Sequence, residues 1–128
     1  MAFIKTTPVL IVDDYNTMLR LIRNLLMQLG IDNVDDANNG EEALVKLQTG
    51  KFGLCISDWN MPTMTGIDLL RQVRANERLK RLPFILVTAE SKTENVIAAR
   101  QAGVSNYIVK PFNAETLRAK IDSVFATA

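Results

Sequence analysis

The feature that most restricts how this chain folds is an alternation of short apolar runs with longer amphipathic stretches. The apolar runs are rich in branched side chains and show little polar alternation, which is typical of buried parallel strands. A stretch with helical periodicity follows each run, so the pattern predicts an α/β fold with five parallel strands and five helices. The five predicted strands are Pro8–Val12, the weaker Val34–Ala37, Leu54–Ser57, Phe84–Thr88 and Tyr107–Val109.

Capping residues predict where the helices begin and end. Asn39, Thr65 and Ser91 each stand three residues before an acidic residue, Asn113 is suited to start the last helix, and Gly30 is suited to end the first. The sides expected to face the sheet carry Met18, Ile22, Leu25, Leu26 and Leu29 in the first helix, Ala43, Leu44 and Leu47 in the second, and Leu117, Ile121, Val124 and Phe125 in the last.

The regular alternation favours a doubly wound (βα)5 sheet of the flavodoxin-like type, with strand order 2-1-3-4-5. We found no linker, repeat or low-complexity tract in the 128 residues. We therefore expect one stand-alone domain over residues 1–128, with no output domain.

The amino-acid composition excludes several classes of function. The chain has no histidine, which excludes histidine bases and histidine-containing metal sites, and its one cysteine, Cys55, is expected in the core. Lys and Arg number 15 against 14 Asp and Glu, so nothing suggests nucleic-acid binding. No apolar run approaches the roughly 20 residues that span a bilayer. We expect a soluble, cytoplasmic protein without membrane insertion.

Polar side chains with related chemistry follow four of the predicted strands. Asp13 and Asp14 come after the first strand, Asp58 after the third, Thr88 ends the fourth and Lys110 follows the fifth. In this fold the first and third strands are neighbours at the switch point, where ligands bind. Two carboxylates about 5 Å apart repel by roughly 3 kcal/mol at an effective dielectric of 20, so the cluster favours a cation. Oxygen ligands suit Mg²⁺, with Mn²⁺ as a substitute.

Such a cluster is suited to phosphoryl transfer. A carboxylate can attack phosphorus, while a metal ion, an ammonium and a hydroxyl neutralise or bind the phosphoryl oxygens. Competing sites lack support, because the chain has no GxxxxGK loop and no GxGxxG turn, and the aspartates after the first strand would repel a flavin phosphate.

Four motifs then identify a resemblance that covers essentially the whole chain. They are VDD at 12–14, DWNMP at 58–62, VTAE at 87–90 and VKPF at 109–112. Together they resemble two-component response-regulator receiver domains, and the finer match is to the CheY-like chemotaxis regulators of that family.

The resemblance implies a role for each matching residue. Asp58 is the implied phosphoacceptor, Lys110 and Thr88 contact the phosphoryl group, and Lys110 precedes a cis proline. Asn60 and Glu90 tune hydrolysis of the phosphoryl group. The implied Mg²⁺ ligands are Asp13, Asp14, Asp58 and the main-chain carbonyl of Asn60.

The resemblance also implies how the signal leaves. Tyr107 swings inward as Thr88 moves, and the fourth helix, fifth strand and fifth helix form a partner face that includes Lys92, Val96, Tyr107 and Lys120. The implied partners are a histidine kinase of the chemotaxis system, the flagellar motor switch and a phosphatase, with the chain itself a monomer.

Other functions stay open at this point. A phosphate-sink receiver would have nearly the same sequence, and a scaffold could keep the fold without phosphorylation. A Mg²⁺-dependent phosphohydrolase with an aspartyl intermediate fits less well, because the adjacent Asp13 and Asp14 do not form an Asp-x-Asp motif and no substrate-binding insert is present.

Overall fold

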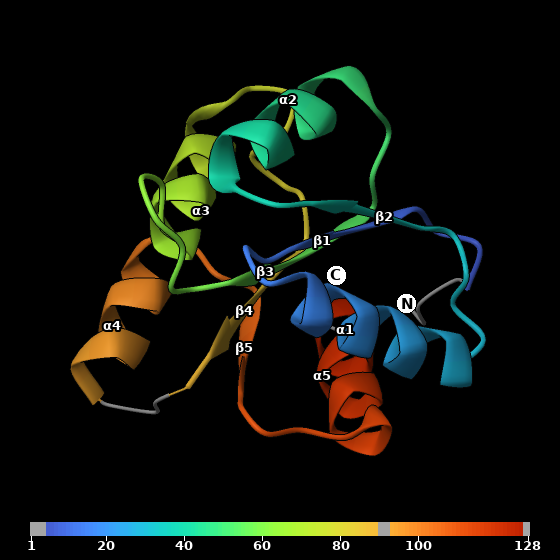
Figure 1. Ribbon diagram of the computed structural model, residues 1–128. Helices are drawn as coiled ribbons and strands as arrows, with labels where there is room; N and C mark the ends of the chain where they lie inside the picture. Colours follow the sequence, from blue (N-terminus) through green and yellow to red (C-terminus); the bar gives the residue numbers. More distant parts are fainter. Residues whose placement is uncertain (1–4, 90–92, 127–128) are drawn as a thin grey trace.

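The predicted alternation of strands and helices is confirmed by the structure, a computed structural model that describes residues 5–89 and 93–126. Five parallel strands lie in the predicted order β2-β1-β3-β4-β5 (Figure 1). The elements are β1 Val9–Val12, α1 Asn16–Gln28, β2 Val34–Ala37, α2 Gly40–Thr49, β3 Leu54–Asp58, α3 Gly66–Ala75, β4 Phe84–Thr88, α4 Thr93–Gln101, β5 Asn106–Val109 and α5 Ala114–Ala126.

Three strand ends differ by one residue from the prediction. Pro8 lies outside β1, since a proline has no N–H to donate to a neighbouring strand. Asp58 is the last residue of β3 and pairs with Val87. Asn106 begins β5 and pairs with Ile85. The hydrophobic pattern did not include these two residues because their side chains are polar, whereas strand pairing depends on backbone groups.

The predicted helix starts are confirmed where the structure describes them. Thr65 and Asp68 form both hydrogen bonds of a capping box at α3. The Asn39 side chain accepts a hydrogen bond from the third backbone N–H of α2. Asn113 has the same role at α5, where its side chain accepts a hydrogen bond from the Thr116 N–H at 2.8 Å. These bonds satisfy amides that have no partner within the helix.

The end of α1 also follows the prediction. Gly30 has a φ of 81°, a left-handed conformation that favours glycine, and its N–H donates to the Met27 carbonyl at 2.9 Å. The predicted helix start at Ser91 lies outside the described residues.

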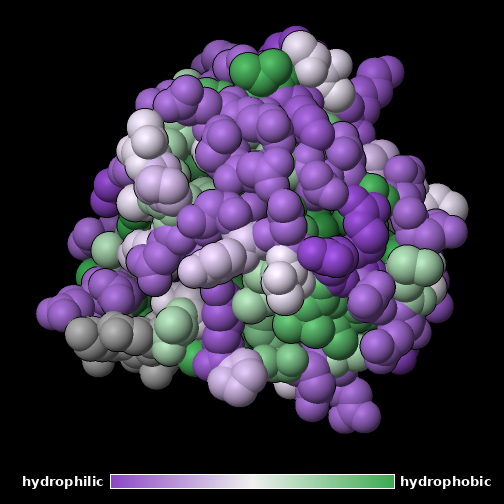
Figure 2. Space-filling view, in the orientation of Figure 1, coloured by the Kyte–Doolittle hydropathy of each residue, from purple (hydrophilic) through white to green (hydrophobic). Residues whose placement is uncertain are grey.

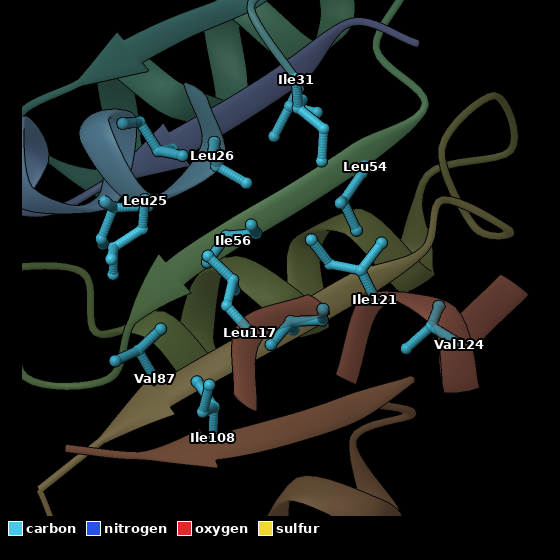
Figure 3. Close-up of a cluster of buried hydrophobic side chains, with 14 of the residues drawn as sticks. Leu25, Leu26, Ile31, Leu54, Ile56, Val87, Ile108, Leu117, Ile121 and Val124 are labelled. Carbon is cyan, nitrogen blue, oxygen red and sulfur yellow. The ribbon is translucent and has the colours of Figure 1, made fainter. Parts of the chain in front are cut away.

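Helices cover both faces of the sheet, with α2, α3 and α4 on one face and α1 and α5 on the other (Figure 1). The layer between the sheet and α1 with α5 is formed by interlocking branched side chains (Figure 3). Leu19 is buried there, which the sequence did not predict, while Met18, Leu29 and Phe125 are only partly buried. Cys55 is fully buried in the opposite layer, as expected.

The surface is mostly hydrophilic over α2 and β2 in the view of Figure 2. Hydrophobic residues gather below the centre of the same face, in the region of α1 and α5. Within the described ranges, no helix combines the length and hydropathy that a bilayer crossing requires.

Candidate functional site

Three carboxylates meet at the carboxyl end of β1 and β3. The parallel register pairs Val12 with Ser57, so the next residues, Asp13 and Asp58, lie side by side. One carboxylate oxygen from each of Asp13, Asp14 and Asp58 lies within 4.8 Å of the others. Asp13 and Asp58 are buried, whereas Asp14 is exposed and faces solvent.

An ammonium group lies against the central carboxylate. The Lys110 Nζ is 2.9 Å from the Asp58 Oδ1, and the Lys110 side chain is three-quarters buried. The Lys110 N–H donates to the Thr88 carbonyl at 2.8 Å, and the peptide bond to Pro111 is cis, as the resemblance implied. This arrangement places one positive charge beside three negative ones.

The pKa of the Asp13 carboxyl is raised above its usual range. Burial raises its pKa to about 6, and the negative charge of Asp58 adds to that effect. The N–H of Tyr15, which donates to the Asp13 Oδ1 at 3.0 Å, and the charge of Lys110 act in the opposite direction. Loss of solvation therefore outweighs the favourable contacts that this carboxylate makes.

The donor set fits a hard divalent cation. The second oxygen of Asp13, Oδ2, is buried and has no hydrogen-bond partner in the described part of the chain. An unpaired buried carboxylate oxygen is costly, and a cation bound by the three clustered oxygens would offset that cost. The acidic triad is thus capable of binding a metal ion.

Two other predicted site residues lie near Asp58, one just after β3 in the chain and one on the neighbouring strand β4. Thr88 is buried at the carboxyl end of β4, beside β3, and Asn60 is exposed two residues after Asp58. Glu90, predicted to tune hydrolysis, lies outside the described residues.

The predicted partner face is brought together in part. Val96 on α4 and Tyr107 on β5 are half-buried, and the Lys120 Nζ of α5 lies 5.1 Å from the centre of the Tyr107 ring. This cation–π contact shows that β5 and α5 contribute side chains to one surface. Lys92 is outside the residues that the structure describes.

Sequence reasoning missed the requirement for glycine at Gly66. A Cβ at this position would lie 2.2 Å from the Asp58 carbonyl oxygen, and the Gly66 N–H donates to the Trp59 carbonyl at 2.8 Å. The start of α3 therefore packs directly on the backbone that carries Asp58. The glycine directly after the Thr65 cap was the available signal.

The sequence matches the response regulator receiver domain family over residues 9–122. It is 56% identical over 117 residues to the chemotaxis protein CheY of Pseudomonas aeruginosa, covering 91% of this chain and 94% of that protein. The fold is similar to that of Vibrio cholerae CheY4, with a TM-score of 0.87, 35% identity and coverage of 93% and 98%.

A third similarity bears on the acidic cluster. The receiver domain of a sensor histidine kinase from Pseudomonas aeruginosa has a TM-score of 0.85 and 25% identity, with coverage of 94% and 98%. Its crystal structure has a magnesium ion coordinated in the active-site cleft.

Proposed function

Because the chain belongs to the response regulator receiver domain family, we propose that it is a chemotaxis regulator whose Asp58 is phosphorylated by a histidine kinase and which then binds the flagellar motor switch. A protein of this family is a phosphoacceptor in signalling and catalyses only its own phosphorylation and dephosphorylation. The membership implies a two-component kinase as a partner. We also propose that this kinase is the one of the chemotaxis system and that the protein is cytoplasmic.

The proposed reaction uses Asp58 as the nucleophile. A carboxylate oxygen attacks the phosphorus of a phosphohistidine, a P–O bond forms, and the P–N bond breaks with its electron pair left on the imidazole nitrogen. Lys110, whose Nζ is 2.9 Å from the Asp58 Oδ1, is placed to neutralise charge on the transferred oxygens. The Thr88 hydroxyl is proposed to bond the phosphoryl group afterwards.

The metal ligands of the proposal are the carboxylates of Asp13, Asp14 and Asp58 and the main-chain carbonyl of Asn60. We propose Mg²⁺ as the resident ion, with Mn²⁺ as a substitute. When bound, such an ion supplies positive charge where the phosphoryl oxygens gather. Asp13 and Asp14 then serve to hold that charge close to Asp58.

We propose that the signal leaves through the surface formed by α4, β5 and α5. Tyr107 lies on this surface and would reorient together with Thr88, changing how Val96 and Lys120 are presented. Lys92 is proposed to belong to the same surface. A shift of population toward the phosphorylated form becomes larger when the partner also prefers that form.

A phosphatase that shortens the signal is a further proposed partner. Asn60 and Glu90 are proposed to set the rate at which the phosphoryl group is hydrolysed.

One observation carries the proposal: three carboxylates and one ammonium converge at the switch point of the sheet, with Asp58 in contact with both kinds of charge. Trp59, the only tryptophan of the chain, is next to Asp58 and provides a fluorescence readout. We expect a change in Trp59 emission on adding Mg²⁺ and a second change on adding acetyl phosphate. Asp58→Asn removes the nucleophile and should abolish the second change.

Circular dichroism of Asp58→Asn serves as the control for folding. A second change in emission that persists in a folded Asp58→Asn variant would contradict the assignment of Asp58. Binding of the phosphorylated protein to a purified motor-switch segment then separates a motor regulator from a phosphate sink, which would accept phosphate without binding that segment.

A further inference from the structure

A groove lies at the amino ends of the strands. It is on the side of the sheet that α2 and α3 cover, and these two helices can be followed in Figure 1. The groove has a volume of about 390 Å³ and lies between the α2–β3 connection, residues 50–53, and the α3–β4 connection, residues 76–83. None of the site residues discussed above lines it. The lining residues are Pro8, Leu47, Gly50, Lys51, Phe52, Gly53, Arg78 and Leu79.

The groove combines apolar walls with positive charge. Leu47 is part of the buried core beneath α2, and Phe52 and Leu79 are partly buried against the same core. Lys51 and Arg78 are exposed, and within the described ranges neither forms an ion pair with a carboxylate. The set that lines the groove therefore includes two cations and no anion.

The nearest acidic neighbour along the chain does not cancel this charge. Glu77 precedes Arg78, but its carboxylate lies 3.0 Å from the Lys80 Nζ. The Arg78 guanidinium reaches a main-chain carbonyl instead, that of Gln48, at 3.5 Å. The rim of the groove is thus positively charged and open to an anionic partner.

Hydrogen bonds hold both walls in place. The Gly53 N–H donates to the Pro8 carbonyl at 2.9 Å, and the Gly50 N–H donates to the last turn of α2 at 2.8 Å. On the other wall the Arg78 N–H donates to the Asn76 side chain at 2.9 Å, and the Leu79 N–H donates to the Asn76 carbonyl at 3.1 Å. A groove with fixed walls loses little conformational entropy when a partner binds.

The groove is separated from the phosphoacceptor by the length of a strand. Gly53 precedes β3 and Asp58 ends it, so the two are roughly 16 Å apart at about 3.3 Å per residue. A partner in the groove would therefore not compete for the carboxylate cluster.

We propose that this groove binds an acidic segment of a partner protein, which places one apolar side chain against Phe52 and Leu79 and its carboxylates on Lys51 and Arg78. An apolar centre with a charged rim is the usual organisation of a protein interface. The two positive charges favour a negatively charged partner, and the apolar walls bury the apolar side chain of that partner. The groove shares no residue with the carboxylate cluster, so the proposed segment makes no contact with Asp58.

The test is an NMR titration of the ¹⁵N-labelled full chain with an acetylated and amidated peptide, EDLFED. We expect saturable shifts of the Gly50, Gly53 and Leu79 amides. The neutral peptide QNLFQN should bind at least about ten-fold more weakly, equivalent to roughly 1.4 kcal/mol. Asp58→Asn should bind EDLFED with unchanged affinity, which separates this proposal from the proposed function.

Matched variants test the two cations. Lys51→Glu and Arg78→Glu should each weaken binding about ten-fold, while Arg81→Glu, which makes the same charge change outside the groove, should not. The spectrum of each variant reports whether it is folded. The proposal is overturned by equal weakening in Arg81→Glu, by shifts confined to residues around Asp58, or by no saturable shift of the groove amides. Concentration-dependent shifts of these amides without peptide would assign the groove to a second copy of the chain, and would also overturn it.

Discussion

Replacing Asp13 with Asn is expected to stabilise the metal-free protein at neutral pH. The side chain of Asp13 is fully buried, and its Oδ2 has no hydrogen-bond partner among the described residues. Burial and the nearby charge of Asp58 raise its pKa from 3.8 to about 6. The carboxamide has the same shape, keeps the acceptor for the Tyr15 N–H and carries no charge to desolvate.

The magnitude follows from the difference in pKa between the folded and unfolded states. About two pH units at 1.36 kcal/mol each correspond to about 3 kcal/mol lost when Asp13 ionises in the folded protein. Between pH 4 and pH 6 the folded state binds more protons at this site than the unfolded state does, so the free energy of unfolding falls as the pH rises. Above pH 6 the loss is complete. Asp13→Asn removes this loss, so we expect a gain of about 1–3 kcal/mol at pH 7.5 and little gain near pH 4.

Urea denaturation followed by circular dichroism, in the presence of EDTA, measures this free energy at each pH. Adding Mg²⁺ should then stabilise the wild type by mass action and leave the variant unchanged, because the variant lacks one of the proposed ligands. Equal effects of Asp13→Asn at pH 4.5 and pH 7.5, or a less stable variant at both, would refute the electrostatic reasoning.

Three further predictions concern packing and capping. Gly66→Ala places a methyl group 2.2 Å from the Asp58 carbonyl oxygen, so we expect a loss of about 1–3 kcal/mol in urea denaturation together with slower labelling by acetyl phosphate; a variant unchanged in both would show that the backbone adjusts freely. Thr65→Ala removes one hydrogen bond of the capping box and should lower the free energy of unfolding by about 1 kcal/mol in the same assay. An unchanged free energy of unfolding would mean that water replaces the cap. Leu26→Ala opens a cavity beneath α1, where Leu26 is fully buried, and should lower the free energy of unfolding by about 2–5 kcal/mol. A thermal unfolding midpoint close to that of the wild type would contradict this last prediction.

Most of the architecture could be predicted because its signals are local. Apolar runs without alternation indicate strands buried on both sides, and capping residues such as Asn39 and Thr65 act within one turn of the backbone. Strand ends were less predictable, since Asp58 and Asn106 are polar yet pair through backbone groups. The burial of Leu19 was also missed, because the rotation of α1 depends on the side chains it meets on the sheet.

The sequence alone determined the order of the strands and the polar residues that follow them, and therefore which side chains meet at the switch point. That inference holds because the carboxyl ends of parallel strands share one edge of the sheet. The environment of each group depends instead on the tertiary structure. The unpaired Oδ2 of Asp13, the close approach of Gly66 to Asp58 and the basic groove beside Lys51 each depend on contacts between segments far apart in the chain, which local patterns do not specify.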